Sequence, residues 1–95
     1  MINTHVTSMI FLRAQLRQEY TVPDHFVDNM IIKSMNLMEG CARKNHITAS
    51  DRLREIALRE RHDGESLDDA IKRAANGVKA AFKFLIENPV AEYDI

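Results

Sequence analysis

The 95-residue chain has few residues that break or cross-link a fold: one cysteine, three glycines, two prolines and no tryptophan. A single cysteine excludes an internal disulfide and is typical of a reducing compartment. No apolar run approaches the roughly 20 residues of a membrane span, and no basic segment precedes an apolar one at the N-terminus as in a signal peptide. We therefore expect a soluble, cytoplasmic protein without a membrane partner.

The charges of the chain nearly cancel, because 13 Lys and Arg residues are balanced by 14 Asp and Glu residues for a net charge of −1. This balance excludes a global attraction to nucleic acid or to an anionic membrane. Hydrophobic residues make up 45% and charged residues 28% of the chain, which indicates a globular protein and not a disordered one. A chain of 95 residues is long enough for one domain with one core.

The most regular stretch runs from Ser66 to Glu87 and predicts the longest helix. Its apolar residues recur at alternating spacings of four and three, which marks one helix face: Leu67, Ile71, Ala74, Val78, Ala81 and Leu85. Ser66 is expected to cap the N-terminus with Asp69 three residues later, and the helix should end at Asn88, before Pro89. Further apolar residues widen this face to roughly 200°, so other helices should pack on two sides of it.

Apolar residues at helical spacing predict three further helices upstream: Thr4–Tyr20, Thr21 to either Gly40 or about Lys44, and Ala49–Arg61. The connections between them are short, which favours antiparallel neighbours. The sequence therefore predicts an all-α fold, a small antiparallel bundle of about four helices with the longest helix C-terminal. Residues 1–88 should form a single helical domain, and residues 89–95, which have no apolar period, should form a flexible tail.

Four single residues mark expected helix ends and one close contact. Thr21 and Thr48 are the expected N-caps of the second and third helices, and Gly64 is the expected C-terminal stop of the third. Gly77 lies inside the longest helix, where glycine costs about 1 kcal/mol relative to alanine. We expect another helix to approach closely at that position, which would explain the glycine.

No catalytic motif is present, neither a nucleophile elbow, a zinc-protease motif, a phosphate-binding loop nor a C-x-x-C pair. A dyad of Cys41 and His46 is conceivable, because thiolate chemistry needs a nearby base. Cys41, however, lies on the predicted apolar face of the second helix, so we interpret it as a buried structural thiol. We expect no enzyme activity and no cofactor.

Metal ligands are not arranged in a recognisable pattern. The four histidines are scattered singly along the chain: His5, His25, His46 and His62. Acidic residues cluster before and at the start of the last helix, without the spacing of an EF-hand: Asp63, Glu65, Asp68 and Asp69. We interpret them as charges that favour the helix N-terminus, with Asp68 pairing to Lys72 and Asp69 to Arg73 one turn later. No metal site is expected.

Nucleic-acid binding is an alternative function. Six basic residues lie within 19 positions in and before the third predicted helix: Arg43, Lys44, Arg52, Arg54, Arg59 and Arg61. A helix-turn-helix could place this helix in a DNA groove, although acidic residues interleave the arginines. The candidate phosphate contacts are Arg43, Lys44, Arg52 and Arg59. The segment Thr48–Arg54 resembles a helix start of some phage terminase small subunits, but it covers under a tenth of the chain and identifies no family.

A protein-binding surface is the function that the pattern favours. Phe11, Ile32 and Leu58 each fall on an otherwise polar face of a different helix, and arginines accompany Leu58. Aromatic and arginine side chains are enriched at interface hot spots. The candidate docking residues are Phe11, Ile32, Arg54, Leu58 and Arg61. We predict a small non-enzymatic adaptor, regulator or inhibitor, of a kind common in bacteria and phages, that binds another protein or forms a homodimer. A DNA-binding regulator and an enzyme are the alternatives.

Overall fold

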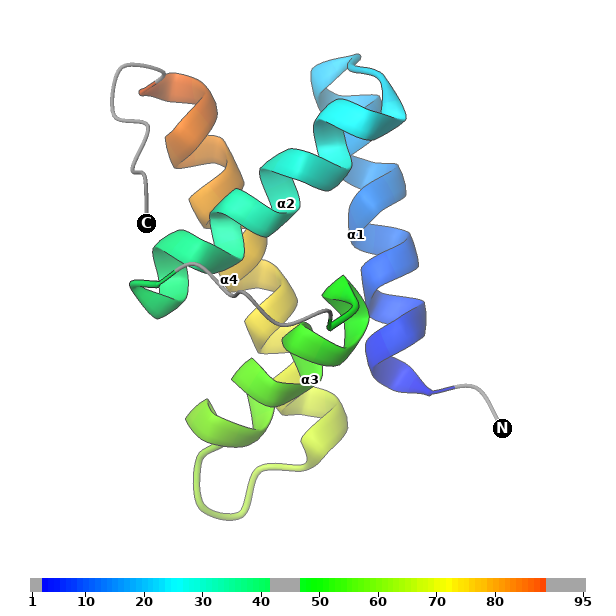
Figure 1. Cartoon of the computed structure of the whole chain (residues 1–95). Helices are drawn as coiled ribbons and strands as arrows, with labels where there is room; N and C mark the ends of the chain where they lie inside the picture. Colours follow the sequence, from blue (N-terminus) through cyan, green and yellow to red (C-terminus); the bar gives the residue numbers. More distant parts are fainter. Residues whose placement is uncertain (1–2, 42–46, 89–95) are drawn as a thin grey trace.

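The computed structural model describes residues 3–41 and 47–88, and these residues form four helices and no strand. In chain order the helices are α1 (Thr4–Tyr20), α2 (Asp24–Glu39), α3 (Ala49–Glu60) and α4 (Leu67–Glu87) (Figure 1). The prediction of an all-α bundle with its longest helix at the C-terminal end is confirmed, since α4 has 21 residues. The predicted tail lies outside the described residues. Within the described ranges, no helix combines the length and the apolar character that a membrane span requires.

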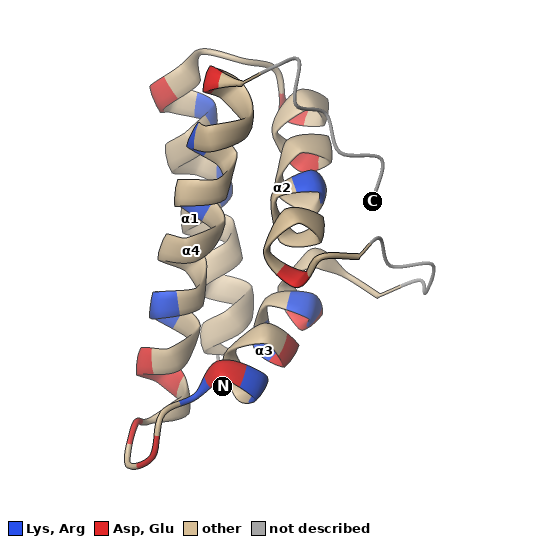
Figure 2. Ribbon diagram, turned by 90° about the vertical axis from the view of Figure 1, so that its left-hand side faces the viewer, with Lys and Arg blue, Asp and Glu red and all other residues tan. Residues whose placement is uncertain are grey.

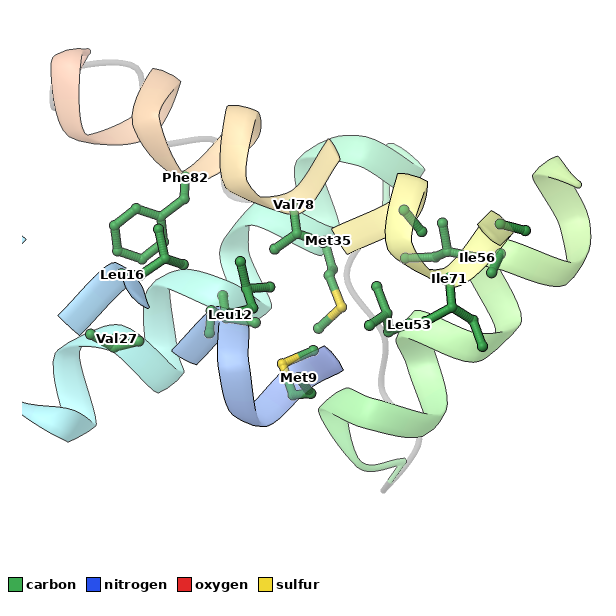
Figure 3. Close-up of a cluster of buried hydrophobic side chains, with 14 residues drawn as sticks. Met9, Leu12, Leu16, Val27, Met35, Leu53, Ile56, Ile71, Val78 and Phe82 are labelled. Carbon is green, nitrogen blue, oxygen red and sulfur yellow. The ribbon is translucent and has the colours of Figure 1, made fainter. Parts of the chain in front are cut away.

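All four helices contribute side chains to one core (Figure 3). Its buried members are Met9, Leu12, Leu16, Val27, Ile31, Met35, Leu53, Ile56, Ala57, Ala70, Ile71, Ala74, Val78 and Phe82. Phe82 has no exposed surface, and its ring centroid lies 5.2 Å from that of Tyr20. Full burial of a side chain of this size stabilises the fold by about 1.5–3 kcal/mol.

The helix α4 is central, as predicted, because it packs against α1, α2 and α3. The chain direction of α2 is roughly opposite to that of α1 and α4, whereas α1 and α4 run in the same general direction (Figure 1). α2 approaches α4 closely at Gly77: a Cβ atom added there would lie 2.9 Å from Cε of Met38. The expected close approach at this glycine is therefore confirmed.

Two of the predicted N-caps are confirmed. The Ser66 hydroxyl accepts a hydrogen bond from the backbone N–H of Asp69 and begins α4. The Thr48 hydroxyl accepts from the N–H of Asp51 and begins α3. Each of these bonds satisfies a donor that the first helical turn leaves free, which fixes where the helix begins.

Two other predicted helix ends are wrong. Thr21 ends α1 with a left-handed backbone (φ 50°), and its N–H donates to the carbonyl of Arg17, so Pro23 and not Thr21 is the N-cap of α2. Gly64 (φ 80°) lies in the turn after α3, which already ends at the C-cap Arg61. In contrast, Gly40 ends α2 with φ 70°, which selects the shorter of the two predicted lengths.

Ion pairs join α1 to α2 near their connection. Nε of Arg13 lies 2.6 Å from Oδ1 of Asp28, and Nη1 of Arg17 lies 2.8 Å from Oδ1 of Asp24. The hydrogen bond from Arg17 lowers the pKa of Asp24 below its usual value, against the opposing effect of desolvation. These pairs hold the antiparallel hairpin of α1 and α2 at its polar rim.

Candidate docking site

The helix α1 has apolar side chains on two opposite faces. Met9, Leu12 and Leu16 point into the core. On the outside, Val6 is 38% exposed, Ile10 61% and Phe11 69%. A surface helix normally has one apolar face, so the exposed apolar side chains on the outside of α1 depart from this pattern. The predicted exposure of Phe11 is confirmed, whereas Ile10 was not foreseen.

A shallow open groove of about 260 Å³ runs between α1 and α4 beside Phe11. Its lining residues come from both helices: Ser8, Phe11, Leu12, Gln15, Lys72, Ala75, Asn76 and Lys79. Each wall spans eight residues, 8–15 and 72–79, which is about two helical turns. Sites that enclose small molecules are usually larger and more closed, at about 300–1,000 Å³. The groove is therefore better suited to side chains of a macromolecule than to a metabolite.

The α4 wall of the groove is positive. Lys72 and Lys79 stand seven residues apart on it, and no acidic residue belongs to the lining. Among the described residues, neither lysine takes part in an ion pair. The expected pair of Asp68 with Lys72 does not form there. The lysine ammonium groups at this wall are thus available to an incoming anionic group.

The other predicted pair on α4 is replaced by a different one. Nη2 of Arg73 donates to Oε1 of Glu65 and to the carbonyl of Glu60, each at 2.8 Å, and not to Asp69. The Arg73 guanidinium, together with a hydrogen bond from the backbone N–H of His62, lowers the pKa of Glu65 to about 2. Arg73 therefore closes the turn between α3 and α4.

Arg52 is buried, which corrects its assignment as a phosphate contact. Its side chain is only 3% exposed. The guanidinium donates to Glu39 Oε1 at 2.5 Å, to Asn36 Oδ1 at 2.8 Å and to the Cys41 carbonyl at 3.3 Å. An arginine that is buried and bonded to three acceptors of α2 and its C-terminal end holds α3 in place, and it cannot reach a nucleic acid.

Arg59, another candidate for nucleic-acid binding, pairs with the same carboxylate. Nη2 of Arg59 lies 3.1 Å from Oε2 of Glu39. Burial acts to raise the pKa of Glu39, but the hydrogen bonds from Arg52 and Arg59 keep it below the usual value, so this carboxylate stays negative beside them. Arg43 and Lys44 lie outside the described residues. Figure 2 shows basic and acidic positions interspersed along the helices in this view.

The predicted docking residues are all exposed but do not form one surface. Arg54 and Leu58 are four residues apart and share the outer face of α3, and Arg61 is the C-cap that follows this helix. Nε of Arg61 donates to the carbonyl of Glu65 at 2.6 Å, which ties this side chain to the turn. Ile32 is exposed on α2. Of the five predicted residues, only Phe11 lines the groove.

The predicted Cys41–His46 dyad and the expected absence of a metal site can be compared with the residues that the structure describes. Cys41 is exposed, so its interpretation as a buried thiol is wrong. The reason is that Gly40 turns the chain out of α2 with a positive φ, and Cys41 no longer follows the apolar face. His46 lies outside the described residues. The described residues contain no group of three or more His, Cys, Asp or Glu side chains that could hold a metal ion.

Comparisons with protein families, with curated proteins and with solved structures find no match to this chain. Function is therefore inferred from the side chains themselves. The part of the site that sequence patterns missed is the groove, since it joins residues of α1 and α4 that lie some 60 positions apart. The only local signal was the seven-residue spacing of Lys72 and Lys79, which places both on one helix face.

Proposed function

We propose that the protein is a small non-enzymatic binding module that docks on another protein through the outer face of α1 and the adjoining groove. The observation that carries this proposal is Phe11, an aromatic side chain that is 69% exposed at the rim of the groove. Ile10 beside it is 61% exposed. Large apolar side chains in this position lose their contact with water when a partner binds, which favours association.

The surroundings of Phe11 have the composition of an interface. Polar side chains line the groove next to it, with Ser8 and Gln15 on α1 and Asn76 on α4. Protein interfaces commonly place an aromatic anchor at the centre and hydrogen-bonding groups around it. Such a site would serve an adaptor, a regulator or an inhibitor, because each of these acts by binding to a partner protein. The free, exposed thiol of Cys41 supports action in a reducing compartment such as the cytoplasm.

DNA binding is the weaker proposal. Two of its four candidate residues, Arg52 and Arg59, hydrogen-bond to Glu39. Phosphate binding would need several free basic groups on one face, and the resulting affinity would fall steeply with salt. The charges of the described helices are mixed instead (Figure 2).

The docking proposal is tested by affinity capture from a lysate, with and without nuclease treatment, using three baits: the natural protein, Phe11→Ser and Leu58→Ser. Leu58 is the matched control because it is also an exposed apolar residue, 44% exposed, but lies on α3. We expect a defined protein to bind the natural bait and the Leu58 variant and to be lost with the Phe11 variant. Circular dichroism must show that all three baits keep the same helix content.

Equal capture by all three baits would refute docking through α1. Loss with the Leu58 variant alone would move the docking site to the outer face of α3. Material that disappears after nuclease treatment would favour the DNA-binding alternative.

A further inference from the structure

We infer that the groove between α1 and α4 binds an amphipathic helix whose acidic side chains meet Lys72 and Lys79 and whose apolar side chains pack on Phe11. This inference rests on the proposed function and adds the chemistry of the partner. Lys72 and Lys79 are needed for this step, because Phe11 alone does not indicate the charge of the partner.

The charge of the partner follows from the two lysines. Both line the groove, neither is paired within the described part of the chain, and the lining contains no carboxylate. A lysine ammonium carries three hydrogen-bond donors and no acceptor, so its natural partner is an anionic oxygen. An acidic side chain is therefore the complementary group, and a basic one would be repelled.

The helical shape of the partner follows from the spacing. Lys72 and Lys79 are two turns apart, which is about 10 Å along the axis of α4. Carboxylates seven residues apart on a partner helix have the same separation and lie on the same face. The walls are two helices that rise together (Figures 1 and 2), so a third helix can lie along the groove between them.

The floor of the groove supplies the apolar contact. Phe11 is 69% exposed and Ala75 is half-buried, so both can contact a partner, whereas Leu12 beside them is only 4% exposed. A partner helix that is acidic along one edge and apolar along its centre would match the lysines and this floor at once. Helix-in-groove binding commonly uses apolar anchors with such spacings.

A second copy of this chain fits the groove less well. In a two-fold dimer the same patch meets itself, so the interface must be self-complementary. The groove contains Lys72 and Lys79 without an acidic counterpart, and two copies would bring like charges together. A nucleic acid is also disfavoured, because two lysines neutralise few phosphates and the chain has a net charge of −1.

The test uses two synthetic helical peptides that share apolar residues at positions i+3 and i+4 and differ only at i and i+7, with Glu in one and Lys in the other. Each is titrated into the isotopically labelled protein, and binding is followed by NMR shifts of the backbone amides. We expect the Glu peptide to bind about tenfold more tightly than the Lys peptide, with shifts at Ser8, Gln15 and Asn76. This preference should shrink as salt is raised.

Charge reversal supplies the decisive comparison. The double variant Lys72→Glu with Lys79→Glu should invert the preference and bind the Lys peptide more tightly. Lys83→Glu is the matched control, since Lys83 is also on α4 but lies outside the groove lining and next to Glu87. This control should keep the preference of the natural protein for the Glu peptide.

Several results would overturn the inference while leaving the proposed function intact. Equal affinity for both peptides, shifts confined to α3, or no peptide binding would each do so, provided that Phe11→Ser still abolishes capture of the protein partner. Two further results name another occupant. A dimer in sedimentation that dissociates in the charge-reversal variant would make it a second copy. Binding of a DNA duplex that is lost in that variant would make it a nucleic acid.

Discussion

The contacts of α2 with α3 and α4 differ sharply from the groove between α1 and α4. On the α2 side, the buried guanidinium of Arg52 donates to three acceptors, and Met38 packs against the bare backbone of Gly77. Along the groove, Lys72 and Lys79 have no ion-pair partner within the described residues. Both regions are rich in basic side chains, but only in the first are their charges neutralised within the fold.

This difference separates basic residues that build the fold from those that are available to a partner. The segment 43–61, in which six basic residues lie within 19 positions, contains Arg52, the only arginine that is buried among the described residues. The two lysines of the groove are less conspicuous in the sequence but keep their charge accessible. The number of basic residues in a segment is therefore a poor guide to function until their partners are known.

The largest expected effect is the loss of the buried guanidinium. Arg52→Met should destabilise the protein by about 3 kcal/mol, because it removes a buried guanidinium that donates to the Glu39 carboxylate, which is itself only 3% exposed. Urea unfolding of this variant and of Arg54→Met measures the effect. Arg54 is the matched control because it lies two residues away in α3 and is exposed. Equal stability of the two variants would mean that the Arg52 contacts are dispensable.

Acid should weaken the paired regions through their carboxylates. The pKa values of Glu39, Glu65 and Asp24 are lowered in the folded state, that of Glu65 from 4.5 to about 2. The unfolded chain then binds more protons as the pH falls, so stability that is present above about pH 4.5 is lost progressively towards pH 2. Thermal unfolding between pH 7 and pH 2 measures this loss.

Glu65→Gln is the variant that isolates one carboxylate in this experiment. It should be less stable than the natural protein at pH 7 and show a flatter acid dependence, because one titrating group has been removed. The groove lining has no carboxylate, so Lys72→Ala should leave the acid dependence unchanged. An unchanged acid profile in Glu65→Gln would contradict the lowered pKa.

A smaller effect is expected where α2 and α4 meet. Gly77→Ala should stabilise the protein by about 0.5 kcal/mol, since alanine favours the helix by about 1 kcal/mol and the displaced methyl end of Met38 can move at a modest cost. Gly77→Leu should destabilise it, because a larger side chain cannot be accommodated by that shift. Urea unfolding distinguishes the two. Stabilisation by leucine would show that the two helices are not closely packed there.

Local sequence signals predicted most of the fold. The bounds of α1 and the caps at Thr48 and Ser66 followed from apolar spacing and from side chains that bond to their own helix. Thr21 was misassigned because threonine tolerates more than one role at a helix boundary, and its left-handed backbone depends on how α1 ends before Pro23. The backbone conformation at such a boundary therefore depends on how the two helices pack, and the residue type alone does not predict it.

The candidate site was predicted only in part, since its key features join distant segments. Phe11 was recognisable as an apolar residue on a polar face. The burial of Arg52 depends on Glu39, which lies 13 positions earlier on another helix. The groove depends on α1 and α4 lying side by side in the same direction. No periodicity within one helix encodes either arrangement, so both required the three-dimensional structure.

The smallest expected effect concerns the groove itself. Phe11→Ser, Lys72→Ala and Lys79→Ala should each change the free energy of unfolding by less than about 0.5 kcal/mol, because these side chains make few contacts that folding must preserve. Urea unfolding of these three variants and of Arg52→Met compares their changes in the free energy of unfolding on one scale. A loss of more than about 1 kcal/mol in any of the three would show that the residue supports the fold. A residue whose removal spares stability and abolishes binding can be assigned to recognition, and this combination distinguishes the groove from the contacts of α2.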